Sequence, residues 1–128
     1  MARMFTQGLD EAIAAAELEA DRIERNGDDA IRVGAAVAVG YLRKEAPERT
    51  GGLRQSIQAM EIKIDANSDR YSDILPDGYN KYGERYATIG FVLEYGRSNM
   101  PPNPWMRRAV QKGEKPVGNA MLDVLRRD

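Results

Sequence analysis

Apolar and polar positions alternate with helical spacing over the first third of the chain. Within residues 9–25, apolar residues recur three or four positions apart with carboxylates between them: Leu9, Ile13, Ala16, Ala20 and Ile23. This spacing predicts an amphipathic N-terminal helix that ends by residue 27. Asn26-Gly27 predicts a stop or a kink there, because glycine commonly follows the last residue of a helix. An aspartate directly after it can cap a second helix over residues 28–45.

The second predicted helix is apolar on nearly every side. Residues 30–40 are all small or apolar except Arg32, and a helix of that kind is normally buried on more than one side. Gly34 and Gly40 each weaken a helix by roughly 1 kcal/mol relative to alanine. We therefore expect close approach of another element, either this protein's own sheet or a neighbouring subunit. Pro47 ends the helix, because proline lacks the N–H and disfavours helical backbone before it.

From residue 58 the period changes to two. Alternate positions form an apolar side with Met60, Ile62, Ile64 and Ala66, and a charged side with Glu61, Lys63 and Asp65. This alternation predicts a half-buried strand. A turn at residues 67–69 and a short returning strand over residues 70–75 complete a predicted hairpin. The polar, tyrosine-rich residues 79–84 predict a surface loop.

The last third of the chain is less uniform. Residues 86–95 alternate as in a strand, yet a helix ended by Gly96 fits the same residues. After a proline-rich stretch, two short helices are predicted over residues 105–112 and 116–127, with Pro104 at the start of the first. The expected fold is α+β in a single domain of residues 1–128. A long N-terminal helical region packs on a small antiparallel β-sheet, with short C-terminal helices.

Composition excludes several kinds of chemistry. The chain has no cysteine and no histidine, which excludes disulfides, thiol catalysis, Cys/His zinc sites and imidazole acid–base catalysis. It has no phosphate-binding glycine-rich loop, EF-hand spacing or HExxH motif. The N-terminus does not resemble a signal peptide, and the longest uncharged stretch, residues 33–42, is too short to span a bilayer. We expect no cofactor, no metal and no enzymatic activity in a protein made in the cytoplasm without a membrane partner.

Charge is spread unevenly, although the net charge is only −1. Before Gly27, six acidic residues face three basic ones, and after Gly96, seven basic residues face three acidic ones. An acidic start and a basic finish can pair head to tail between the subunits of a ring. The alternative is that both faces contact only water.

Two motifs resemble those of a known family. The first is Ala46-Pro47-Glu48-Arg49-Thr50-Gly51-Gly52-Leu53-Arg54. The second is Phe91-Val92-Leu93-Glu94-Tyr95-Gly96, followed by Pro102-Asn103-Pro104-Trp105-Met106. Together they resemble the small tail-component or neck family of long-tailed bacteriophages and prophages. The resemblance covers residues 28–110, and it favours a helix for residues 86–95.

The resemblance implies a structural virion protein that forms or joins a ring, commonly a hexamer, at the head–tail interface during assembly. Its partners would be other copies of itself, an adaptor or head-closure protein, and a tail-tube or terminator protein. Genomic DNA would pass through the lumen without sequence readout, and the expected location is the virion neck or tail. The family usually has phenylalanine where Trp105 stands and often a basic residue where Asn103 stands. A contact made by that basic residue therefore does not carry over to this chain.

The resemblance also implies which residues serve assembly. The interface residues would be Glu94, Tyr95, Gly96, Arg97, Pro104 and Trp105, and the turn motif would be shaped by Pro47, Thr50, Gly51 and Leu53. On physical grounds, Glu94 either faces water or pairs with a base, since a buried unpaired carboxylate is costly; the nearest bases are Arg97, Arg107 and Arg108. A catalytic role for Glu94 would require a second carboxylate or a matched base, which no motif supplies. Trp105 either packs in the core or fills a pocket on a neighbour.

A small phage-encoded regulatory or nucleic-acid-binding module is the alternative. Aromatic and basic residues that can stack on single strands are interleaved in one stretch: Arg70, Tyr71, Tyr79, Lys81, Tyr82, Arg85 and Tyr86. Carboxylates in the same stretch cancel its charge: Asp69, Asp73, Asp77 and Glu84. Strong, salt-dependent DNA binding would favour this alternative. A hydrolase is the weakest class, because no nucleophile–base pair can be named, and nothing in the chain supports a toxin or inhibitor.

Overall fold

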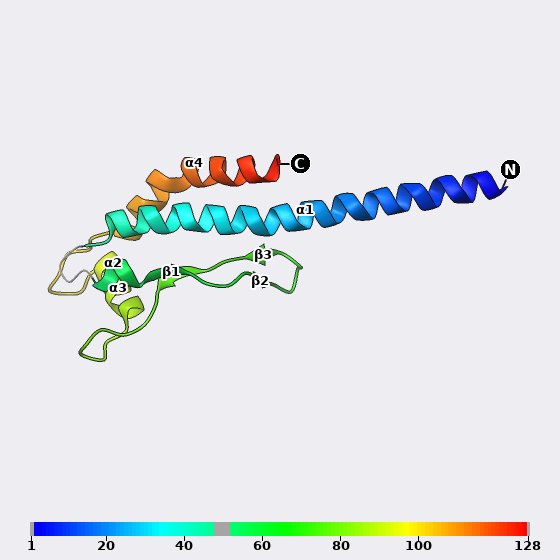
Figure 1. The fold of residues 1–128 in the computed structure, drawn as a ribbon. Helices are drawn as coiled ribbons and strands as arrows, with labels where there is room; N and C mark the ends of the chain where they lie inside the picture. The colour runs from blue at the N-terminus through cyan, green and yellow to red at the C-terminus, as the bar shows by residue number, and fades with distance from the viewer. Residues whose placement is uncertain (1, 48–51, 128) are drawn as a thin grey trace.

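The chain is organised around one long helix (Figure 1). The computed structural model describes residues 2–47 and 52–127, with the side chains of residues 10–22, 24–47 and 52–127. Helix α1 (Ala2–Glu45) lies between helix α4 (Trp105–Leu125) on one side and a β-hairpin with two short helices on the other. The expected α+β class is confirmed.

A helix stop at Asn26-Gly27, one of the two predicted alternatives, is wrong, because α1 continues through both residues. Glycine in a helix interior costs about 1 kcal/mol relative to alanine, and the tertiary contacts on either side of this point outweigh that preference. The side-chain amide of Asn26 donates a hydrogen bond to the backbone carbonyl of Arg127 at 2.9 Å. The N-terminal helix therefore does not end by residue 27.

Helix α4 lies antiparallel along the second half of α1, and glycines bring the two helices close together. A Cβ atom at Gly34 would stand 2.6 Å from Cγ of Met121, and one at Gly113 would stand 3.2 Å from the ring of Tyr41. A side chain at Gly34 would force Met121 to move, and one at Gly113 would make a tight contact with Tyr41. The expected close approach is therefore confirmed at Gly34, where the other element is α4 and not the sheet or a second subunit.

Residues 30–40 of α1 are packed on two sides and exposed on another. Within residues 30–40, Ala30 and Ala35 are buried, whereas Val33, Ala36 and Gly40 are exposed. The expectation of burial on more than one side is met, because Gly34 lies against α4 and Val39 packs against the core cluster, but a further side stays open to solvent. Small apolar residues lower the cost of exposure as well as allowing close packing, so their presence alone does not report burial.

The two predicted C-terminal helices form the single helix α4, which runs unbroken through Pro116. Proline within a helix normally costs about 3 kcal/mol. The following turns lie against α1, with Val117 and Met121 beside Gly34 and with Val124 buried, and this packing stabilises the continuous helix. Pro104 stands directly before the first residue of α4, as expected.

A single long hairpin joins the two short helices. The short helices are α2 (Gly52–Ser56) and α3 (Tyr86–Tyr95). The antiparallel pairs are β1 (Ile57–Ala59) with β4 (Ile74–Pro76), and β2 (Lys63–Ile64) with β3 (Arg70–Tyr71). The predicted hairpin and the helix over residues 86–95 are confirmed.

The turn at residues 67–69 forms because the Asp65 carboxylate accepts the backbone N–H groups of Asn67 and Asp69, at 2.8 and 2.9 Å. The expected half-burial of the strand fails toward this turn. Ile64 is 58% exposed and Ala66 is also exposed, because the hairpin extends past the core. An alternating pattern reports two faces of a strand but not whether anything covers one of them.

The core lies where α2, β1 and the start of α4 meet the end of α1. Its fully buried members are Ala46, Leu53, Ile57 and Trp105. The guanidinium of Arg54 donates to the carbonyl of Ala46 at 2.7 Å, which ties α2 to the end of α1. Of the predicted turn motif, Pro47 follows α1 as expected and Leu53 is a core residue; Thr50 and Gly51 lie outside the described residues.

Ion pairs hold both neighbours of α1 in place. Glu45 accepts hydrogen bonds from Lys112 at 2.6 Å and Arg108 at 3.2 Å, and these lower the pKa of its carboxyl group. On the opposite side, Arg70 of the hairpin donates to the carboxylates of Glu24 and Asp28, which raises the pKa of the guanidinium. Acidic residues of α1 are thus paired within the same chain at its middle and its C-terminal end.

Candidate assembly surface

Helix α3 and the loop after it carry the second sequence motif. The helix ends at Gly96, whose φ of 77° is in the left-handed region and whose N–H donates to the carbonyl of Val92 at 2.7 Å. A Cβ atom at Gly96 would stand 2.8 Å from the carbonyl oxygen of Met100. Glycine is required here both for the backbone conformation and for space, as the sequence suggested.

Glu94 binds the start of the next helix. Its side chain is only 7% exposed, and its two carboxylate oxygens accept the backbone N–H groups of Met106 at 2.7 Å and Arg107 at 3.2 Å. The first N–H groups of a helix have no partner within the helix and carry partial positive charge, so a carboxylate is well suited to them. Both expectations for Glu94, exposure to water and pairing with a base, are wrong.

A signal for this contact was present in the sequence. Helix α4 starts after Pro104, which has no side-chain oxygen and makes no capping hydrogen bond. A helix start without Ser, Thr, Asp or Asn leaves its first N–H groups to water or to an acceptor from another part of the chain. Glu94, a carboxylate in an otherwise apolar run close by in sequence, is an acceptor suited to these N–H groups.

Trp105 packs in the core and is 1% exposed. Its indole Nε1–H donates to the carbonyl of Gly90 at 3.0 Å, and its Cζ2 would stand 3.0 Å from a Cβ atom at that glycine. Of the two alternatives for Trp105, core packing is correct. The tryptophan locks α4 onto α3 and does not reach a neighbouring molecule.

An aromatic pair projects from α3. The rings of Phe91 and Tyr95 lie 4.6 Å apart at an interplanar angle of 48°, and each residue is 61% exposed. Such tilted ring pairs attract one another beyond their area of contact. The resemblance implies an interface role for Tyr95 and names none for Phe91. Their spacing of four residues on a helix indicates that the two rings are neighbours.

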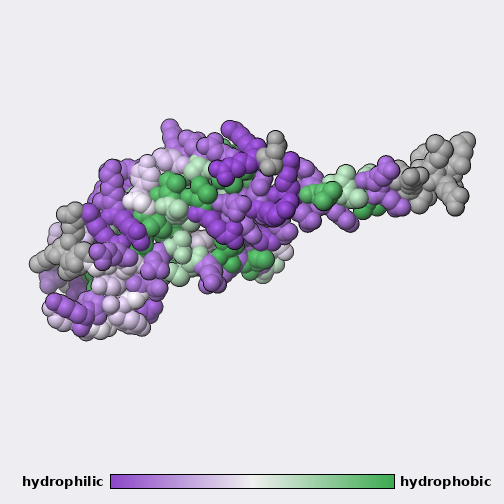
Figure 2. Space-filling view, viewed as in Figure 1, coloured by the Kyte–Doolittle hydropathy of each residue, from purple (hydrophilic) through white to green (hydrophobic). Residues whose placement is uncertain are grey.

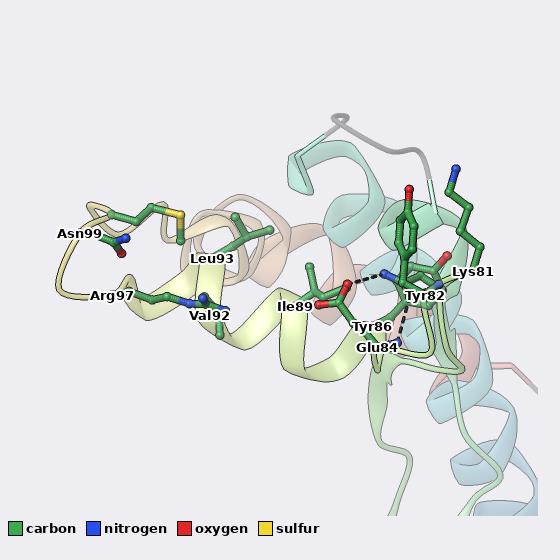
Figure 3. Close-up of a pocket in the computed structure, with 11 residues that line it drawn as sticks. Lys81, Tyr82, Glu84, Tyr86, Ile89, Val92, Leu93, Arg97 and Asn99 are labelled. Carbon is green, nitrogen blue, oxygen red and sulfur yellow. Dashed lines mark hydrogen bonds between the residues drawn. The ribbon is translucent and has the colours of Figure 1, made fainter.

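An open groove lies along the other side of α3 (Figure 3). Its volume is about 970 Å³, and α3 lines it with Ile89, Val92 and Leu93. The remaining walls come from residues 80–86 and from the loop after Gly96, including Arg97, Asn99 and Met100. Arg97, an expected interface residue, therefore lies at the groove, on the side opposite the aromatic pair.

The predicted loop at residues 79–84 is exposed except for half-buried Asn80, and it has a defined shape. The side-chain oxygen of Asn80 accepts the backbone N–H groups of Tyr82 and Glu84, both at 2.9 Å. The ammonium group of Lys81 lies 5.1 Å from the centre of the Tyr82 ring. These contacts give the groove a preformed wall.

The aromatic pair and the groove face in opposite directions. With about 100° of rotation per helical residue, Ile89 and Leu93 lie on one side of α3 and Phe91 and Tyr95 on the other. We call the two together the α3 surface. Glu94 and Trp105 hold α3 against α4, and Gly96 sets the turn after α3. Tyr95 and Arg97 are themselves part of the α3 surface.

The described residues contain no group of three or more potential metal-binding carboxylates. Among the helices in residues 2–47 and 52–127, none has the length and apolar character needed to cross a bilayer. No protein-family model matches this chain, and no curated protein or solved structure is significantly similar to it.

Proposed function

We propose that this chain is a structural protein of the neck or tail of a long-tailed phage or prophage, which forms or joins a ring at the head–tail interface. The α3 surface is the observation that carries the proposal. A ring is built from heterologous contacts, in which one patch of a subunit meets a different patch of the next. The projecting aromatic pair and the recessed groove are two such patches on opposite sides of one short helix.

The packing behind the α3 surface supports an assembly role. The Glu94 carboxylate and the Trp105 indole each bond backbone of the other helix, so α3 and α4 meet at a fixed corner. A surface that is already rigid loses less conformational entropy when a partner binds. Residues of the phage-like motif thus hold the surface in position or form part of it.

The hydrogen bonds of two carboxylates, Glu94 and Glu45, support a role other than catalysis. The buried carboxylate of Glu94 is occupied by two backbone N–H groups, and the carboxylate of Glu45 by two cationic side chains. Neither is available as a general base in this arrangement.

The test is deletion of the gene in the phage or prophage that encodes it, followed by electron microscopy of the lysate. We expect DNA-filled heads and separate tails, with joining restored by the wild-type gene but not by Phe91→Ala/Tyr95→Ala. The matched control is Tyr71→Ala, which removes an exposed aromatic ring from the hairpin. Normal yields of joined virions from the deletion, with the chain absent from purified particles, would refute the proposal. Strong, salt-dependent DNA binding by the purified chain would then favour a regulatory module.

A further inference from the structure

The N-terminal part of α1 projects from the rest of the molecule (Figures 1 and 2). Near the start of the packed part of α1, Asn26 bonds the end of α4, and Glu24 and Asp28 bond the hairpin. Residues 2–22, which we call the arm, extend beyond these contacts, and residues 10–21 are all exposed. At 1.5 Å per residue the arm is about 30 Å long.

The arm has an apolar stripe beside an acidic row. Ile13, Ala16 and Ala20 lie on one side of the helix at spacings of three and four residues, and Ile13 is 48% exposed. Asp10, Glu17 and Asp21 share an adjoining strip at spacings of seven and four. An isolated helix of this length is marginal in water, and tertiary packing of an amphipathic face is what normally stabilises it.

The outer side of α4 has the complementary character. It exposes three apolar side chains, those of Val110, Leu122 and Leu125. Exposed bases stand among them, namely Arg107, Lys115 and Arg126. Helix α4 has 21 residues and is about 30 Å long, so its length matches that of the arm.

Charge favours one of the possible helix pairings between two copies, which are arm with arm, α4 with α4, and arm with α4. The arm has five acidic and two basic residues, a net charge of −3, whereas residues 105–127 have six basic and two acidic residues, a net charge of +4. Pairing arm with arm, or α4 with α4, would bring like charges together, whereas arm with α4 brings opposite charges together. Within one chain α1 is straight and carries the arm away from its own α4 (Figure 1).

We propose that the arm of one copy packs along the outer side of α4 of a second copy. The apolar stripe packs on Leu122 and Leu125, and the acidic row lies near Lys115 and Arg126. Because the two surfaces differ, each copy both donates an arm and accepts one, so the contact propagates and closes into a ring when the rotation between copies allows it. This inference rests on the proposed function, and it names the surfaces through which copies would meet.

The test uses two double charge reversals in the full chain. One variant is Glu17→Lys/Asp21→Lys on the arm, and the other is Lys115→Glu/Arg126→Glu on α4. None of these four side chains makes a hydrogen bond or ion pair recorded within residues 2–47 and 52–127. The mass of each protein, and of an equimolar mixture, is measured by light scattering at matched concentration in low salt, with circular dichroism to verify folding.

We expect the wild type to be an oligomer, each variant alone to be a monomer, and the mixture to reassemble. In the mixture the reversed positions 17 and 21 of one variant meet the reversed positions 115 and 126 of the other, and the unchanged arm meets an unchanged α4, so opposite charges face each other at both contacts of an alternating assembly. The matched control, Glu61→Lys/Asp73→Lys, makes the same change in net charge as the arm variant, but on exposed hairpin residues, and should retain the wild-type mass. High salt should weaken the wild-type oligomer.

A wild-type monomer, a variant that retains the oligomer, or a mixture that fails to reassemble would each overturn the inference. These results are distinguishable from failure of the proposed function. If the reversed variants still join heads to tails, the neck role stands and the arm contact is wrong. If the mixture reassembles but the gene is dispensable for joined virions, the contact stands and the neck role is wrong.

Discussion

The carboxylate of Glu94 near the end of α3 accepts the backbone N–H of Met106 in the first turn of α4, at 2.7 Å. The residues between them form a tight loop that Gly96 allows to turn. The start of one helix is therefore stabilised by the end of another, and the direction of α4 along α1 depends on this contact. Glu94, for which the resemblance implies an interface role, sets the geometry of its own chain.

Replacing Glu94 should therefore destabilise the fold. Glu94→Ala leaves the N–H groups of Met106 and Arg107 without their acceptor, and we expect a loss of about 1–3 kcal/mol in the free energy of unfolding. Glu94→Gln retains one carbonyl oxygen and should cost less. Urea denaturation measures both, with Glu114→Ala on the exposed part of α4 as the control. Unchanged stability of Glu94→Ala would show that the cap contributes nothing.

Gly90 and Trp105 make a second contact that tolerates little change. A methyl group at Gly90 would meet Cζ2 of Trp105 at 3.0 Å, so Gly90→Ala should destabilise the fold by about 1–3 kcal/mol through overpacking. Gly40→Ala is the matched control, because a Cβ atom there would meet nothing within 4 Å. That control should stabilise the protein by about 0.5–1 kcal/mol through helix propensity. Thermal unfolding of both variants measures the difference, and equal melting temperatures would contradict the close packing.

Stability should depend on pH through Glu45. Lys112 and Arg108 lower the pKa of this carboxyl group in the folded protein below its ordinary value of 4.5. The folded state therefore binds fewer protons, and the stabilisation is fully present above pH 4.5 and is lost as the pH falls through the folded-state pKa. The difference in unfolding free energy between wild type and Glu45→Gln should be constant at neutral pH and shrink in acid.

Denaturant titrations across this pH range make the measurement. Lys112→Gln provides the control, because removing a cationic partner should reduce the same acid-dependent difference while leaving the carboxylate in place. A difference that grows on acidification would reverse the predicted sign.

Arg70 should determine how firmly the hairpin lies on α1. It donates to both oxygens of Asp28, at 3.0 and 2.9 Å, and to Glu24. Arg70→Ala should leave global unfolding nearly unchanged but increase the rate of amide hydrogen exchange in residues 63–71, because these strands have few buried contacts. Lys63→Ala, on the same exposed hairpin, is the control. Equal exchange rates in wild type and Arg70→Ala would show that the ion pairs do not restrain the hairpin.

Local chemistry determined much of this protein from the sequence alone. Helical periodicity and the turn at residues 67–69 each depend on residues a few positions apart, so their patterns predicted the helical character of residues 9–45 and 105–127, the hairpin and the α+β class. The exposed loop at residues 79–84 was predicted for the same reason. For residues 86–95 the pattern fitted a strand and a helix alike, and the short helix α2 was not predicted.

Tertiary structure decided what depends on contacts between distant residues. Gly27 and Pro116 disfavour a helix locally, yet both lie inside continuous helices because α1 and α4 pack against each other. Periodicity revealed an apolar side on the hairpin but not that nothing covers Ile64. Likewise, Glu94 had no visible partner in sequence because its partners are backbone N–H groups, which every residue except proline carries, and only the fold selects which ones it meets.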